Sequence, residues 1–146
     1  MVDVRTEISI NRPIDVVAHY AADPYHAPQW YDNIKAIEWV TMKPLQLGSK
    51  MAFIAYFLGR KLEYVYEVTD YVPGKKLVMT TANGPFPMQT TYTWNTENVG
   101  VTKMTLQNKG VPTGFSKMVT PFMSFMMKKA NKKDLLKIKQ ILEQNK

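Results

Sequence analysis

Apolar and polar residues alternate at the start of the chain and again through most of its middle. From Val2 to Ile10, valine and isoleucine alternate with charged residues and serine, which predicts a strand with one solvated face. Period-two segments predict six further strands: Ile34–Met42, Ser49–Leu58, Lys61–Tyr71, Lys76–Thr81, Phe86–Trp94 and Val101–Asn108. The short connections between them contain proline, glycine and asparagine, so we expect tight turns and an antiparallel meander.

Two short helices are predicted between the first two strands. Ile14–Ala22 follows Pro13, a residue that suits the start of a helix, and Asp23-Pro24 ends the segment. Pro28 then limits a second helix, around Tyr25–Tyr31, to about one or two turns.

The apolar period becomes helical near the C-terminus. Thr120-Pro121 is typical of an N-cap followed by a first-turn proline, so a long helix is predicted over Pro121–Gln144, with a separate turn at Phe115–Val119. One face is apolar and comprises Met123, Met127, Ala130, Leu135, Ile138, Ile141 and Leu142. The opposite face carries Lys128, Lys129, Lys132, Lys133, Lys137 and Lys139. Asn131 and Asp134 are polar but fall on the apolar side.

A curved sheet with large apolar side chains on one face needs a cover, and the long helix is the element of sufficient size. We therefore expect one α+β domain over residues 1–146 with a helix-grip architecture. In it, a curved antiparallel sheet of about seven strands wraps around the C-terminal helix and leaves a cavity between them.

Four segments resemble the SRPBCC, or START-like helix-grip, superfamily, in its polyketide cyclase/dehydrase and lipid-transport branch. They are Ile10–Val17 (INRPIDVV), Ala22-Asp23-Pro24 with Trp30 six residues on, Glu67–Leu77 with its Pro73-Gly74-Lys75 turn, and Lys133–Glu143. The resemblance covers essentially the whole chain and implies a deep pocket for a hydrophobic small molecule. The superfamily uses such pockets for lipid carriage, hormone sensing, and cyclisation or dehydration of polyketides. These segments mark turns and packing positions, so they identify the fold and not the activity.

Composition and charge exclude several classes of site. The chain has no cysteine, which rules out disulfides, thiolate catalysis and cysteine-ligated metals, and its two histidines are too few for an all-histidine metal site. No nucleophile–base pair, carboxylate pair or phosphate-binding glycine loop is visible, which argues against a dedicated hydrolase or metalloenzyme. We expect no cofactor and no metal.

The net charge of +7 is concentrated at one end of the chain. Residues 1–100 hold nine basic and ten acidic residues, whereas residues 101–146 hold ten lysines and two acids. Most of these lysines lie on the outer face of the predicted helix, where they keep the protein soluble or steer it towards an anionic membrane or acidic lipid. No aromatic stacking platform accompanies them, so nucleic acid is not an expected partner.

The candidate ligand-binding residues combine aromatic rings with flexible methionines, which suit a lipid-like molecule. From the sheet they are Tyr64, Tyr66, Phe86, Met88, Tyr92 and Trp94. From the lid region they are Met118, Phe122, Met123, Met126 and Met127. The alternative is that these side chains simply fill the core.

Further polar candidates lie on the helices. His26 is a candidate general acid/base at the mouth of the cavity or, alternatively, an exposed loop residue, whereas His19 is expected to be a packing or surface residue. Asn131 and Asp134 present an amide and a carboxylate to a ligand, unless Asp134 pairs with lysines of its own helix. Trp30 and Trp39 are expected to be packing residues.

Three functions follow from these observations. The first is a carrier or sensor of a small hydrophobic or lipid-like ligand. The second is a cyclase-, dehydratase- or isomerase-type enzyme on a polyketide-like substrate, with a tyrosine or His26 as acid/base. The third is an interaction module, which either acts as an accessory to a partner protein or self-associates as a homodimer. Two apolar segments, Met51–Leu58 and Phe122–Met127, support this third possibility. The chain shows neither a signal peptide nor an apolar run long enough to span a bilayer, so we expect a cytoplasmic protein without stable membrane insertion.

Overall fold

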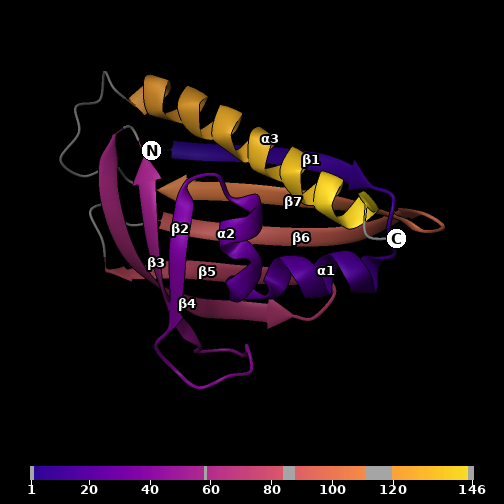
Figure 1. Ribbon diagram of the computed structural model, residues 1–146, viewed down its shortest axis with the longest axis horizontal. Helices are drawn as coiled ribbons and strands as arrows, with labels where there is room; N and C mark the ends of the chain where they lie inside the picture. Colours follow the sequence, from indigo (N-terminus) through magenta and orange to yellow (C-terminus); the bar gives the residue numbers. More distant parts are fainter. Residues whose placement is uncertain (1, 58, 84–87, 111–119, 145–146) are drawn as a thin grey trace.

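A computed structural model describes residues 2–57, 59–83, 88–110 and 120–144 (Figure 1). The first strand is followed by three short helical segments, and the last strand precedes the long C-terminal helix. The elements are β1 (Val2–Ile10), α1 (Ile14–Ala22), the 3-10 helix η1 (Pro24–His26), α2 (Ala27–Trp30), β2 (Ile34–Trp39), β3 (Lys50–Phe57), β4 (Arg60–Val72), β5 (Lys76–Asn83), β6 (Met88–Asn98), β7 (Val101–Gly110) and α3 (Thr120–Gln144).

The seven strands form one antiparallel sheet in the order β1-β7-β6-β5-β4-β3-β2, which confirms the predicted meander from β2 to β7. Tight turns join its neighbours: in the turn between β4 and β5, Lys75 N–H donates to Val72 C=O at 2.9 Å, and Gly74 has φ +78°. The register of β4 shifts twice against β5, at Val65/Tyr66 and at Val68/Asp70. Such irregularities bend a strand and increase its twist, and they contribute to the curvature that the sheet shows in Figure 1.

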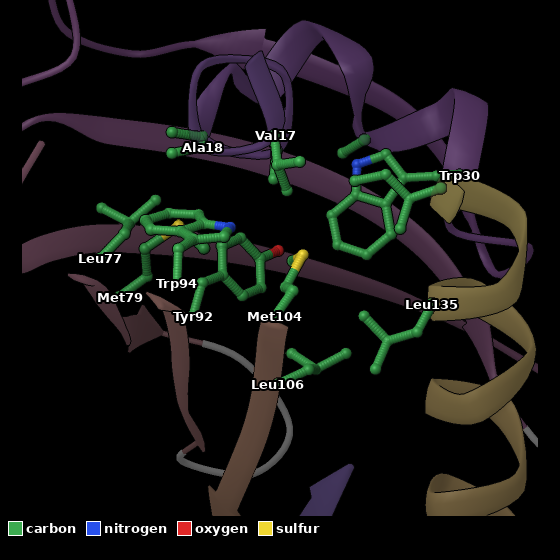
Figure 2. Close-up of a cluster of buried hydrophobic side chains, with 14 of the residues drawn as sticks. Val17, Ala18, Trp30, Leu77, Met79, Tyr92, Trp94, Met104, Leu106 and Leu135 are labelled. Atoms are coloured by element: carbon green, nitrogen blue, oxygen red, sulfur yellow. The ribbon is translucent and has the colours of Figure 1, made fainter. Parts of the chain in front are cut away.

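The helices all lie on one side of the curved sheet (Figure 1). α3 runs along β1, and α1 and α2 cover the part of the sheet that α3 leaves open. The main core lies between these layers: Figure 2 shows Val17 and Ala18 of α1 and Leu135 of α3 facing Trp94, Met104 and other side chains of the sheet. The predicted α+β helix-grip fold is therefore confirmed.

A smaller buried cluster joins the two ends of the chain. Val2 and Val4 of β1 pack with Met123 and Met127 in the first half of α3, and Met88 lies against the group. This cluster fixes the N-terminal half of α3 to the sheet beside the cavity described below.

Element boundaries differ from the predicted ones by a few residues. β2 ends at Trp39 rather than Met42, because the N–H groups of Val40 and Thr41 both donate to the carbonyl of Lys50 and turn the chain away from the ladder. β6 continues four residues beyond Trp94, to Asn98. The predicted turn at Phe115–Val119 lies outside the described residues, and α3 begins at Thr120.

α3 has the two faces that its sequence predicts, with one exception. The predicted apolar positions are buried or half-buried, and the lysines at 128, 129, 132, 133 and 137 are exposed. Lys139 is half-buried instead, because its Nζ donates to Ser9 C=O at 2.7 Å and to Glu143 Oε2 at 2.6 Å. This lysine therefore anchors the end of the helix to β1 rather than belonging to a solvated face.

Candidate functional site

A cavity of about 130 Å³ lies between the sheet and the middle of α3. Its walls are mainly apolar and come from strands β2 to β7, from α3 and from the segment between α2 and β2. The lining residues are Tyr31, Asn33, Ile34, Phe53, Ala55, Leu62, Tyr64, Tyr66, Met79, Met88, Thr90, Tyr92, Asn108, Met127, Ala130, Asn131 and Asp134. The sheet therefore curves around α3 without filling the space beneath it.

Most polar groups of the cavity wall are paired with one another. The hydroxyls of Tyr31 and Tyr92 lie 2.7 Å apart and share a hydrogen bond, and Thr90 Oγ1 donates to Asn108 Oδ1 at 2.8 Å. Burial raises the pKa of Tyr31 well above its usual 10, and its neighbour Tyr92 raises it further. Burial also raises the pKa of Tyr66, although a hydrogen bond with Thr90 partly offsets the effect. These phenols are therefore neutral hydroxyls at physiological pH.

Asp134 is the acidic residue in the wall, and it is only 2% exposed. Its Oδ1 accepts the backbone N–H of Asp32 at 3.0 Å, which ties the end of α2 to α3 and fixes Tyr31 beside the cavity. Burial raises the pKa of this carboxyl to about 7, against the lowering effects of the Asp32 N–H and of Lys133. A carboxyl of this kind can hold or release a proton close to neutral pH.

Asn131 lies one helical turn before Asp134, on the same face of α3. The residue is 4% exposed, and its Nδ2 is buried with no hydrogen-bond partner within the described part of the chain. A buried amide nitrogen without an acceptor is uncommon because it has lost its hydration without compensation. The nitrogen is covered by surrounding protein atoms, so Asn131 borders the cavity without presenting this atom as an open surface.

The predicted ligand-binding residues divide into four groups. Five of them line the cavity: Tyr64, Tyr66, Met88, Tyr92 and Met127. Trp94 shares a strand face with Tyr92 but lies in the main core under α1 (Figure 2). Met123 belongs to the smaller cluster with Val2 and Val4. Phe122 is 54% exposed, and Met126 is half-buried in a surface pocket that it shares with Asn33 and Ala130. Phe86 and Met118 lie outside the described residues.

The two histidines are not part of the cavity wall. His26 stacks on Tyr20 with ring centroids 4.1 Å apart, and its Nδ1 lies 2.9 Å from Tyr20 C=O. His19 is exposed on α1. Trp30 is buried against Tyr31 and Tyr92, as a packing residue would be, and Trp39 is half-buried.

The most informative cavity residue that sequence reasoning missed is Tyr31. It forms the C-cap of α2, in a segment where the sequence points only to His26 as an acid or base. An aromatic residue at the end of a short helix gives no periodic signal. Its partner Tyr92 is 61 residues away, so their pairing emerges only from the folded chain.

Neither a metal centre nor a membrane span is found among the described residues. No group of three or more histidine, cysteine, aspartate or glutamate side chains within them is arranged to hold a metal ion. No helix in this part of the chain is long and apolar enough to cross a bilayer.

Solved structures with the same architecture include proteins that are described in different ways. One is TTHA0849 from Thermus thermophilus, with 16% identity, 98% of each chain covered and a TM-score of 0.84. A second is the Zhui aromatase/cyclase from a Streptomyces species, with 15% identity, 97% of this chain and 93% of that one covered, and a TM-score of 0.78. A third is a START superfamily protein from Mycobacterium smegmatis, with 13% identity, 99% of each chain covered and a TM-score of 0.79.

At these low sequence identities, the solved structures establish only the fold. The assignment to a family rests on the sequence comparison. No curated protein matches the chain in sequence. The family model described as polyketide cyclase / dehydrase and lipid transport, however, matches residues 1–143. A match over nearly the whole length, on a helix-grip fold with an apolar cavity under its long helix, shows that the chain belongs to the polyketide cyclase/dehydrase and lipid-transport family.

Proposed function

We propose that the protein binds a small hydrophobic molecule in the cavity between its sheet and α3, as a carrier or sensor. The observation that carries the proposal is the cavity itself, an apolar space of about 130 Å³ beside a well-packed core. Interiors are normally close-packed, and an unfilled apolar space costs stability that a bound ligand restores. Apolar side chains would supply the binding free energy, and the few polar groups would set orientation.

Native mass spectrometry of the purified protein, with solvent extraction of anything that it retains, tests this proposal directly. We expect a bound or readily loaded hydrophobic molecule that raises the melting temperature, because a ligand that binds only the folded state stabilises it. Ala130→Leu adds a bulky side chain to the cavity wall and should abolish that stabilisation while leaving the protein folded. Gln140→Leu, at an exposed position of α3, is the matched control and should bind normally. If Ala130→Leu binds the same molecule with unchanged affinity, the cavity is not the binding site.

A second function, proton transfer on the bound molecule, is favoured by one specific observation. Asp134, with its pKa raised to about 7, lies in the same wall as the hydroxyls of Tyr31 and Tyr92. A carboxylate can take a proton from a carbon next to a carbonyl group while a hydroxyl donates a hydrogen bond to the carbonyl oxygen. Asp134 replaces His26 as the candidate acid/base, because His26 does not line the cavity.

Isotope exchange separates the two functions. Acetophenone in deuterium oxide should exchange its methyl protons faster with the wild-type protein than with Asp134→Asn, and His26→Asn should behave like the wild type. If acetophenone binds but its methyl protons do not exchange faster, Asp134 is excluded as a base for this class of ligand. The function as a carrier or sensor would then stand alone.

A further inference from the structure

The solvent side of α3 carries large apolar side chains. Phe122 is 54% exposed, Phe125 is 65% exposed and Leu136 is 51% exposed. Their spacing places them within about 60° of one another around the helix axis. Single exposed apolar residues are common on protein surfaces, but two phenylalanines within one helical turn form a local cluster. α3 is therefore apolar along part of its outer side as well as on the face that it buries.

The outer side of α3 is also cationic. Its exposed lysines are Lys128, Lys129, Lys132, Lys133 and Lys137. Among the described residues, Lys133 is the one of these five that forms an ion pair, with Asp32 at 3.5 Å. The acids of α3 do not offset the charge, because Asp134 is buried in the cavity wall and Glu143 is engaged at the far end of the helix. The outer side of α3 therefore has a net positive charge beside its exposed phenylalanines.

This combination matches the layers of an anionic bilayer surface. Aromatic rings enter the boundary between headgroups and acyl chains, while lysines beside them meet the anionic headgroups. A second copy of the chain would bring the same lysines face to face, so charge opposes self-association through this side of α3. A nucleic-acid duplex offers phosphates but no apolar layer for Phe122 and Phe125. The chemistry therefore favours a membrane over either of these partners.

The outer side of α3 also borders the cavity. Met126, Lys129 and Leu136 line a surface groove of about 540 Å³. Asn33 and Ala130 line both this groove and the cavity. A bilayer that covers the groove would therefore lie next to the proposed ligand site.

We propose that α3 docks on anionic membrane surfaces through this side of the helix. We define the docking face by its exposed apolar residues and the lysines between them: Phe122, Phe125, Lys129, Lys132, Lys133 and Leu136. The helix lies along the bilayer surface while its buried face stays packed on the sheet, so docking is peripheral and needs no unfolding. The inference goes beyond the proposed function, because docking requires neither a ligand nor the cavity.

Vesicle co-sedimentation tests the role of charge. We expect the wild type to bind phosphatidylcholine vesicles that contain about 30% phosphatidylserine at least about tenfold more strongly than vesicles of phosphatidylcholine alone. Lys129→Gln/Lys132→Gln should weaken this binding at least about tenfold, because each lysine near an anionic surface contributes about fivefold. The matched control is Lys43→Gln/Lys75→Gln, which makes the same charge change at two exposed positions outside α3 and should alter binding less than about threefold.

A second pair of variants tests the apolar part of the docking face. Phe122→Ser/Phe125→Ser should weaken binding to the anionic vesicles at least about tenfold, because it removes the side chains that enter the interface. The competing surface is the loop between β2 and β3, where Met42 is 86% exposed and Leu47 is 68% exposed. Met42→Ser/Leu47→Ser is therefore the matched control and should change binding less than about twofold.

A measurement on the wild type does not depend on how the variants fold. With a nitroxide-labelled lipid in the anionic vesicles, the amide resonances of residues 122–133 should broaden more than those of the loop between β2 and β3. Stronger broadening of that loop, or equal binding to neutral and anionic vesicles, would overturn the proposal.

The remaining outcomes identify other partners or separate the two proposals. If no vesicle binds, but the protein forms a dimer or binds a DNA duplex and Phe122→Ser/Phe125→Ser abolishes this, the face belongs to that partner and membrane docking is wrong. Loss of docking alone leaves ligand binding in the cavity standing. Docking of a protein that binds no apolar molecule would support this inference and contradict the proposed function.

Discussion

Burial of the Asp134 carboxyl group links the stability of the fold to pH. Asp134 is held in the cavity wall by α3, and its pKa is raised to about 7 from an ordinary 3.8. In the unfolded chain the group titrates near its ordinary value, so folding takes up a proton between these two pH values. The contribution of Asp134 to stability is therefore greatest below pH 3.8 and is lost as the pH rises through about 7.

Replacing Asp134 by asparagine should remove this dependence. The amide oxygen of the variant can still accept the N–H of Asp32, but nothing titrates. We expect the free energy of unfolding of the wild type to fall, relative to Asp134→Asn, by up to about 1.4 kcal/mol per pH unit between pH 4 and pH 7. Urea unfolding at several pH values measures the difference. Gln140→Leu, at an exposed position of α3 with no titrating group, is the control and should run parallel to the wild type.

At the residue scale, the sequence predicted the direction of side chains more accurately than it predicted their contacts. Alternation along β6 correctly turns Tyr92 and Trp94 to the interior. The same alternation cannot say that Tyr92 reaches the cavity while Trp94, two residues on, lies beneath α1. Whether a given position of β6 faces the cavity or α1 depends on where the short helices pack on the sheet. No local sequence pattern encodes that placement.

At the scale of elements, α3 carries both the packing face and the polar groups of the site. Helical periodicity placed Asn131 and Asp134 on its apolar side, and both are buried. Periodicity gives a face but not its neighbours, so the sequence could not decide between a ligand contact and an ion pair along the helix. The structure pairs Lys133 with Asp32 at 3.5 Å and leaves Asp134 to accept the backbone N–H that follows α2.

Truncation to alanine should lower the free energy of unfolding strongly on the buried face of α3 and only slightly on its exposed face. Ile138 is fully buried and packs in the main core, whereas Leu136 is 51% exposed. Ile138→Ala should lower the free energy of unfolding by roughly 2–5 kcal/mol, because it removes buried methyl groups and leaves a cavity. Leu136→Ala, on the exposed face, should change it by about 0.5 kcal/mol or less. Urea denaturation with an unchanged m-value measures both, and similar losses would mean that the outer face of α3 is covered in solution.

At the scale of the whole molecule, the fold is closed by contacts between its first dozen residues and its last helix. Arg12 Nη1 donates to Leu142 C=O at 2.6 Å, and Asn11 N–H donates to Glu143 Oε2 at 2.8 Å. Lys139 bridges Glu143 and Ser9 C=O. Because these partners are about 130 residues apart, they can form only when β1 and α3 have both docked on the sheet.

The carboxylate of Glu143 is the centre of this closure, and its removal gives the last prediction. Glu143→Ala deprives the Asn11 N–H of its acceptor and Lys139 Nζ of one of its two acceptors, so the free energy of unfolding should fall by about 1–2 kcal/mol. Glu143→Gln keeps an oxygen that can accept the Asn11 N–H and should recover about half of that loss. Because β1 and α3 dock as one unit, amide hydrogens in both should exchange faster in Glu143→Ala than in the wild type, by the same factor. Faster exchange in α3 alone would show instead that the helix opens independently of the sheet, and the cavity beneath it would then be accessible without unfolding of β1.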